Sequence, residues 1–263
     1  MAATDLFAYR IRRWSALTWI VVICAAVFIA VRIAGAIMTD GAAARSLVDW
    51  LALPACLPSA LHRPWTPLTY MFTHYDVFHL LFNMLWLYWF GIIFLSFSSS
   101  RRLIETYLAG GIAGAAVYLL FNLAASSASG HSMIGASGAV LAVVAATAVM
   151  TPRLKLNLML IGPVEIRWIA IAVVALDVIS LGNGNPGAHL AHLAGAGAGA
   201  AFVMARRRIS YHGNKRNRTT VKSPADAPDD KAELDRLLDK IRISGYSSLT
   251  AEERRILFEI SRK

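Results

Sequence analysis

The chain of 263 residues is 57% hydrophobic and only 16% charged, with a mean hydropathy of +0.52. These values lie far from those of an average soluble domain and predict an integral membrane protein. The net charge of +10 is spread in short clusters between apolar runs, which argues against nucleic-acid binding. The two cysteines argue against a disulfide framework or a cysteine metal site.

Six apolar runs follow in chain order, most of them close to the roughly 20 residues that a spanning helix needs. They cover residues 17–37, 78–97, 105–123, 137–150, 164–181 and 188–205. Arginine and lysine gather at 10–13, 101–102, 153–155 and 206–208, always on one side of a six-span arrangement. This side, with both termini, is predicted to be cytoplasmic, and no cleavable signal peptide is expected. The predicted fold class is an all-α membrane protein with a six-transmembrane-helix bundle.

The fourth run, from Ser137 to Met150, is too short to span a membrane. As a helix it rises about 21 Å, against a hydrocarbon layer of about 30 Å. Its outer end is therefore expected roughly 9 Å below the external surface. Irregular chain at that depth, such as residues 132–136, needs a wet cavity lined by protein. Ser137 is predicted at the floor of this cavity, at a helix N-terminus whose free N–H groups can receive an anion.

Small residues predict close packing between the fourth and sixth runs. Gly195 and Gly199 form a GxxxG pattern on the sixth run. His192 precedes them by three and seven residues, so it shares their face and is expected to point at the fourth helix. On the second run, His79 and Asn83 lie one turn apart and present an imidazole and a carboxamide to the same side.

Each of these polar residues alone has an ordinary explanation, because such side chains in membrane helices commonly pack or hydrogen-bond between helices. Together they supply the groups that acyl transfer needs. His192 would act as general base, and Ser137 would attack a peptide carbonyl. Asn83 and the Ser137 N–H would stabilise the oxyanion. A water from the external cavity would then release the acyl-enzyme.

Three segments carry a resemblance to a known family: Gly135-Ala136-Ser137-Gly138, Ala191-His192-Leu193-Ala194-Gly195 and His79-Leu80-Leu81-Phe82-Asn83. In order and placement they resemble the GxSG, AHxxG and HxxxN motifs of rhomboid intramembrane serine proteases. The resemblance covers about residues 10–208 and implies a Ser137–His192 dyad, with His79 and Asn83 lining the oxyanion site. It implies no metal and no cofactor. The C-terminal segment is similar to an appendage of some bacterial rhomboids, which implies a bacterial cytoplasmic membrane protein.

Three positions bear on how well the resemblance holds. His74 falls where many members have a histidine, which implies that it orders the first loop. The family's Trp-Arg is replaced by Pro-Trp-Thr at 64–66, so its arginine salt link is lost unless Arg63 substitutes. The aromatic residue that packs on the base in many members is Leu141 here, which predicts a less tightly oriented His192.

Two further polar residues compete for a role in the site. His189 lies one turn before His192, but only His192 has a glycine at plus three, so His192 is preferred as the base. His189 is expected to tune the site or to meet solvent. Asp177, near the outer end of the fifth run, could complete a triad. A snorkelling or loop-facing carboxylate is preferred, since the resemblance implies a dyad.

The charge density rises sharply after about residue 205. The expected organisation is a six-helix core at 1–208, a flexible linker at 209–230 and a small helical cytoplasmic tail at 231–263. One helical face of the tail is formed by Leu234, Leu237, Leu238 and Ile241. Thr250 and Glu253 have the capping-box pattern of a second helix. So small an amphipathic pair needs a surface to cover, which predicts a cytoplasmic partner for the tail.

The leading hypothesis is an intramembrane serine endopeptidase whose substrates are transmembrane proteins cleaved within the lipid bilayer, near the outer ends of their helices. The alternative is a catalytically weak or inactive rhomboid-like binder of transmembrane segments, against which the presence of both Ser137 and His192 argues. A metal site or transporter built from His79, His189 and His192 is less favoured, because neither an HExxH motif nor an inverted repeat accompanies them.

Overall fold

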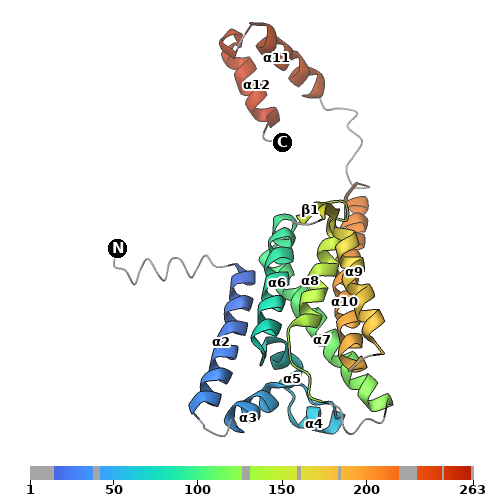
Figure 1. The fold of residues 1–263 in the computed structure, drawn as a ribbon. Helices are drawn as coiled ribbons and strands as arrows, with labels where there is room; N and C mark the ends of the chain where they lie inside the picture. Colours follow the sequence, from blue (N-terminus) through green and yellow to red (C-terminus); the bar gives the residue numbers. More distant parts are fainter. Residues whose placement is uncertain are drawn as a thin grey trace. The chain divides into compact units, whose positions relative to one another are not determined.

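The structure, a computed structural model, describes residues 15–37, 42–125, 131–158, 161–182, 185–218, 230–244 and 246–261. The chain divides into two compact units, Met1–Ile209 and Ser210–Lys263. The first unit is a bundle of helices and the second is a small helical unit (Figure 1).

Six helices of the first unit lie where the six apolar runs predict them: α2 (Ala16–Ile37), α6 (Val77–Phe97), α7 (Ser100–Ala124), α8 (Ser137–Met150), α9 (Ile166–Ser180) and α10 (Pro186–Arg218). Within the described residues, α2, α6, α7 and α10 contain stretches long and apolar enough to cross a membrane. Helices α8 and α9 are shorter, with 14 and 15 residues.

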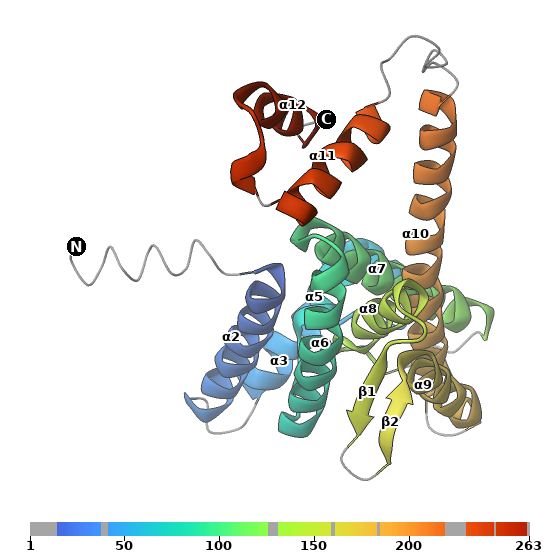
Figure 2. The ribbon, with the colours of Figure 1, turned by 90° about the horizontal axis from the view of Figure 1, so that it is seen from above.

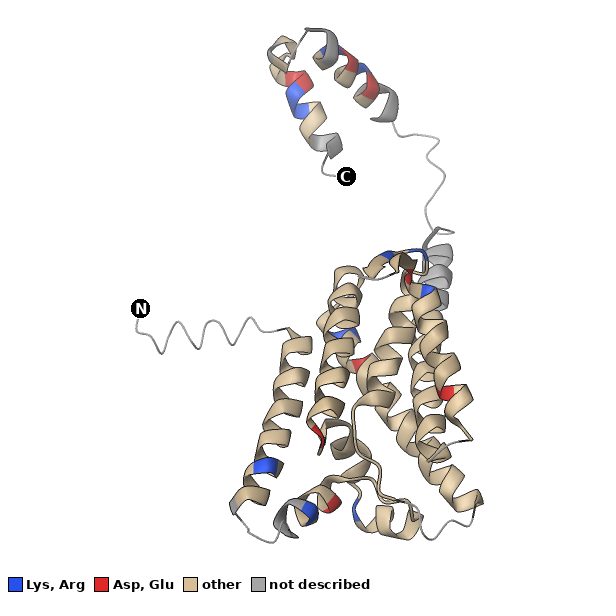
Figure 3. Cartoon of the chain, viewed as in Figure 1, with Lys and Arg blue, Asp and Glu red and all other residues tan. Residues whose placement is uncertain are grey.

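The outer surface of this bundle is apolar. Charged side chains are sparse along its helices (Figure 3). Large exposed apolar side chains include Trp19, Phe82, Trp89, Leu120 and Ile179. Exposed apolar side chains of this size and number are unfavourable in water and suit a lipid environment.

Helix α8 lies at the centre of the bundle, with α6, α7, α9 and α10 around it (Figure 2). Its side chains are small or β-branched and almost all are buried; those with no exposed surface are Ala139, Ala142, Val143, Ala146 and Thr147. Because these side chains are short, neighbouring helices approach its backbone closely.

The closest approach to α8 comes from the two glycines of α10. A Cβ built on Gly195 would lie 2.1 Å from the carbonyl oxygen of Gly138, and one on Gly199 would lie 2.0 Å from the carbonyl oxygen of Ala142. No side chain fits in either place. The predicted glycine contact between the fourth and sixth runs is therefore confirmed.

One end of the bundle carries ion pairs that join α7 to α10. The Glu105 carboxylate lies 2.9 Å from Arg101 Nε on its own helix and 2.8 Å from Arg206 Nη2 of α10. Two of the basic clusters are thus at the same end of the bundle, as the six-run arrangement predicts. These exposed pairs contribute little to stability.

A β-hairpin that was not predicted follows α8. Strand β1 (Lys155–Leu158) pairs antiparallel with β2 (Gly162–Glu165). The fifth apolar run was drawn from residue 164, whereas α9 begins at Ile166. Hydropathy alone cannot separate Val164 of the strand from the helix that follows, because both are apolar.

The segment between α2 and α6 contains α3 (Ala42–Leu51), α4 (Leu57–His62), α5 (Thr66–Thr69) and the 3-10 turn η1 (Tyr70–Phe72). Arg63 Nη1 donates to the Asp49 carbonyl at 2.8 Å. Trp65 Nε1 donates to the Trp50 carbonyl at 2.9 Å, and the two indole rings are 4.9 Å apart. Arg63 therefore does fasten the first loop, although through a backbone carbonyl and not through a salt link.

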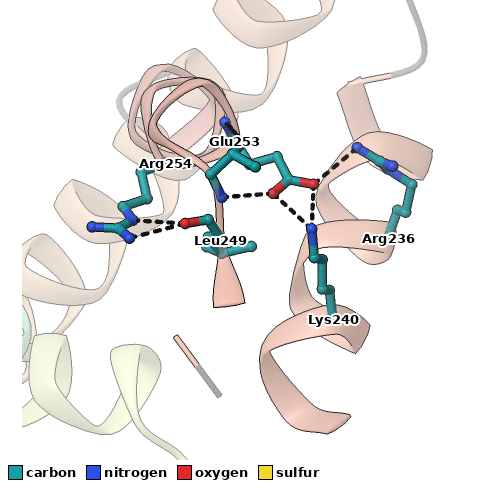
Figure 4. A network of polar contacts seen from close by, with 6 residues as sticks. Arg236, Lys240, Leu249, Glu253 and Arg254 are labelled. Carbon is teal, nitrogen blue, oxygen red and sulfur yellow. Dashed lines mark hydrogen bonds and ion pairs between the residues drawn. The ribbon is translucent and has the colours of Figure 1, made fainter. Parts of the chain in front are cut away.

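The second unit contains α11 (Asp230–Ser244), the turn η2 (Tyr246–Ser248) and α12 (Ala251–Ser261). The predicted capping box is confirmed: Glu253 N–H donates to Thr250 Oγ1 at 3.2 Å, and Thr250 N–H donates to Glu253 Oε2 at 2.9 Å. Lys240 of α11 donates to both Glu253 oxygens at 2.8 Å (Figure 4). Leu237 and Leu249 are buried in this unit. Glu253 thus caps one helix and ties it to the other.

The expected linker at 209–230 is partly wrong. Helix α10 continues to Arg218, so residues 209–218 are helical, and α11 begins at Asp230. A polar, basic composition does not by itself end a helix, because lysine and arginine are good helix formers. Residues 219–229 lie outside the described residues.

Gly199→Ala should destabilise the first unit by more than about 2 kcal/mol, since its Cβ would overlap the α8 backbone. Gly197→Ala is the matched control on the same helix, because a Cβ there meets nothing within 4 Å. Thermal unfolding in detergent should show a lower Tm for Gly199→Ala alone. Equal Tm values for the two variants would contradict the close contact.

The hydrogen bonds from Lys240 lower the pKa of Glu253 to about 2. The ionised form therefore stabilises the second unit fully above about pH 4.5, and this contribution is lost as the pH falls through about 2. Glu253→Gln should increase amide hydrogen exchange in α11 and α12 at neutral pH. Glu252→Gln, which breaks only a pair with Arg255 three residues away, should leave exchange unchanged.

Candidate active site

Ser137 is the first residue of α8, the shortest of the six helices that correspond to the apolar runs. The chain arrives at Ser137 as non-helical backbone, as its predicted depth requires. Gly135 has a φ of +116°, and a Cβ there would lie 2.5 Å from the ring of His79. Glycine is needed at this position both for the backbone conformation and for space.

The backbone that leads to Ser137 is held by the first loop. Leu53 and Met133 exchange two backbone hydrogen bonds, of 2.9 and 2.8 Å. Gly135 N–H donates to the Tyr70 carbonyl at 2.9 Å. Ala136 N–H donates to Nε2 of His74 at 3.3 Å. These bonds satisfy backbone groups that would otherwise be buried without a partner.

His74 was expected to order the first loop, and its hydrogen bond is to the backbone just before Ser137. Its side chain has no exposed surface. Burial lowers its pKa to about 4, so the ring is neutral near pH 7 and Nε2 can accept the hydrogen bond from Ala136. Leu53 and Tyr70 were not predicted, because main-chain contacts leave no motif in the sequence.

His192 lies on α10 three residues before Gly195, on the face that contacts α8. Its Nε2 atom is 2.5 Å from Ser137 Oγ. The structure therefore brings together the two residues that the sequence proposed as nucleophile and base. His189, the competing base, makes its polar contact with Asp177 and not with Ser137.

The prediction that Asp177 is a snorkelling or loop-facing carboxylate is wrong. It lies on α9 near the end of that helix and is only 9% exposed. Its Oδ1 atom is 2.9 Å from Nδ1 of His192 and 2.8 Å from Nδ1 of His189. The two histidines, one turn apart on α10, converge on one oxygen, which turns the carboxylate inward.

A cavity of about 280 Å³ opens beside Ser137. Its apolar wall contains Phe82, Trp86, Val140, Leu141, Val173 and Leu176, and its polar residues are Asn83, Ser137, Asp177, Ser180 and His192. The lining comes from α6, α8, α9 and α10. An apolar pocket with a few convergent polar groups is the usual form of a binding or active site.

The two residues predicted on α6 have different surroundings. Asn83 lines the cavity, and its Nδ2 donates to the His79 carbonyl at 2.8 Å. The His79 ring lies against Gly135 and packs edge-on to His74, with 5.1 Å between centroids. Asn83 thus shares the cavity with Ser137 and His192, while His79 supports the backbone just before Ser137.

A metal-ligand grouping does occur in the described part of the chain, but not the expected one. The ligand atoms of Asp177, His189 and His192 lie within 4.8 Å of one another. His79 does not belong to this group. Hydrogen bonds between the carboxylate and the two rings already satisfy these atoms.

Comparison with known families agrees with this architecture. The family described as Rhomboid domain matches residues 61–209. The chain belongs to the rhomboid family. Residues 227–263 match a second family, one of unknown function designated DUF6576. The rhomboid match and the apolar helices together make the chain a multi-pass membrane protein.

Two curated relatives are rhomboid-like proteins of eukaryotes. RHOMBOID-like protein 12, mitochondrial, of Arabidopsis thaliana is 33% identical over 156 residues, which cover 54% of this chain and 46% of the relative. Presenilin-associated rhomboid-like protein A, mitochondrial, of Danio rerio is 32% identical over 151 residues, covering 56% and 37%. The chain thus spans less than half the length of these relatives. Both are named as mitochondrial, so a bacterial origin stays a prediction.

Proposed function

We propose that this rhomboid-family protein is an intramembrane serine endopeptidase that hydrolyses peptide bonds in or near transmembrane segments. The observation that carries the proposal is the 2.5 Å contact between Ser137 Oγ and His192 Nε2, beside a cavity among apolar helices. A hydroxyl and an imidazole at this distance form a nucleophile–base pair.

The chemistry follows from the groups around the cavity. His192 Nε2 takes the Ser137 proton as Oγ attacks the peptide carbonyl, and later returns it to the leaving amine. The N–H of Ser137 belongs to the first turn of α8, where N–H groups have no partner within the helix. This N–H and the Asn83 side chain are the donors for the oxyanion. His79, whose ring lies against Gly135, is proposed to line the oxyanion site with Asn83, as the resemblance implies.

The substrate class follows from the surroundings of the site. Because the bundle surface is apolar, a substrate segment reaches the cavity laterally from the bilayer. We further propose six spans with both termini in the cytoplasm, since the basic clusters follow that pattern. A bacterial cytoplasmic membrane remains the proposed location. The second unit, with its own family match, is proposed to bind a cytoplasmic partner.

Ser137→Ala should reduce cleavage of a reconstituted transmembrane substrate by at least about 10³-fold, because it removes the nucleophile. Ser180→Ala is the matched control, since Ser180 lines the same cavity. A fluorophosphonate probe should label the native protein and Ser180→Ala, but not Ser137→Ala. A folded native protein that neither cleaves nor reacts with the probe would favour the non-catalytic binder.

Asn83→Ala should lower kcat by about 10²–10³-fold with little change in KM, since an oxyanion donor acts mainly in the transition state. Asn122→Ala is a close structural control. Asn122 is equally buried on α7 and makes the same bond to the carbonyl four residues earlier, at 2.8 Å. Steady-state kinetics in proteoliposomes would test this; equal losses in both variants would remove Asn83 from the oxyanion site.

A further inference from the structure

The Asp177 carboxylate has no role in a Ser137–His192 dyad, yet it is an acidic group that is almost fully buried beside the cavity. A carboxylate in a membrane bundle is costly to bury and marks a functional site. Asp177 is 9% exposed, and one of its oxygens meets two imidazole nitrogens at 2.8 and 2.9 Å. The apolar side chains of Val173 and Leu176 line the cavity next to it.

The hydrogen-bond pattern assigns the proton positions on His192. An ionised carboxylate only accepts hydrogen bonds, so Nδ1 of His192 must carry the hydrogen that points to Asp177. In the neutral ring this leaves Nε2 unprotonated, and Nε2 is the atom that faces Ser137 Oγ. Asp177, His192 and Ser137 therefore form a continuous chain of hydrogen bonds.

We propose that Asp177 is a positioning residue that holds His192 in the tautomer and orientation needed to accept the Ser137 proton. This inference rests on the proposed protease function. Asp177 would take the place of the aromatic residue that orients the base in many family members. That position is Leu141 here, and its side chain lines the same cavity. In this chain a hydrogen bond from the imidazole to a carboxylate orients the ring.

The proton balance of the attack step shows why a carboxylate is suited to this place. As the bond from Ser137 Oγ to the carbonyl carbon forms, the carbonyl electron pair moves to oxygen and the hydroxyl proton moves to Nε2. His192 becomes an imidazolium with both nitrogens protonated. Asp177 stays ionised and stabilises that positive charge. When the C–N bond breaks, Nε2 gives its proton to the leaving amine and the neutral ring is restored.

His189 provides an internal comparison for the same carboxylate. It donates to the same Asp177 oxygen at 2.8 Å, but the contact with Ser137 is made by His192. His189 therefore helps to fix the carboxylate and takes no part in proton transfer. Its loss should affect turnover much less than the loss of Asp177.

The kinetic test compares Asp177→Asn, Asp177→Glu and His189→Gln in the full-length protein in proteoliposomes. An asparagine amide can donate to Nδ1 and favour the wrong tautomer. Asp177→Asn should lower kcat by about 10²–10⁴-fold with KM changed less than about threefold. Asp177→Glu should recover at least about tenfold of that loss, and His189→Gln should stay within about tenfold of native. Activity of the native protein should not change when EDTA is added.

A spectroscopic test distinguishes a positioning role of Asp177 from a role in folding. It also tests that role independently of the protease activity. Ring ¹⁵N shifts of labelled His192 should show the Nδ1–H tautomer in the native protein and in Ser137→Ala, and a shift toward Nε2–H in Asp177→Asn. The Tm of Asp177→Asn should confirm that it folds. An unchanged tautomer, a native kcat in folded Asp177→Asn or loss of activity in EDTA would overturn the proposal. An inactive native protein that retains the tautomer shift would contradict only the proposed function.

Discussion

The arrangement of the site depends on one backbone contact, between the glycine face of α10 and the first turns of α8. At Gly195 and Gly199 the two helices are so close that a single added carbon would lie about 2 Å from a carbonyl oxygen. This contact fixes the distance between the helices and their rotation. His192 lies one turn before Gly195, so it is carried to the start of α8, where Ser137 lies. The 2.5 Å contact between the two side chains is thus a consequence of helix packing.

A second constraint comes from the depth at which α8 begins. Because α8 has only 14 residues, the non-helical backbone that leads to Ser137 is expected within the membrane, where every N–H and C=O needs a partner. The first loop supplies these partners through Leu53, Tyr70 and His74. The loop is therefore part of the site although it carries none of the proposed reacting groups. Its own anchors, such as the Arg63 bond to Asp49, stabilise Ser137 indirectly.

The parts of the site that could be predicted are those with a local pattern in the sequence. Short helix length, GxxxG spacing and one-turn offsets depend on a few neighbouring residues, so α8, the glycine face and His192 were found. Asp177 was misjudged because its partners lie 12 and 15 residues away, on another helix. Whether a carboxylate near a helix end turns inward or toward water depends on the packing of α9 against α10, which has no local signal. The hairpin β1–β2 was missed for a similar reason, since its short apolar strand adjoins an apolar helix.

The geometry of the attack limits how a substrate could bind under the proposed function. In an intact α-helix each interior carbonyl accepts a hydrogen bond within the helix and is surrounded by side chains, so Ser137 Oγ cannot approach it. The scissile segment must therefore leave its helical form before its carbonyl reaches Ser137. That unwinding exposes backbone polar groups, which the bilayer cannot satisfy and the polar side of the cavity, with Asn83, can. Substrates with glycine or proline near the cleaved bond lose less on unwinding, so the weaker the helix around that bond, the more readily the segment should reach Ser137.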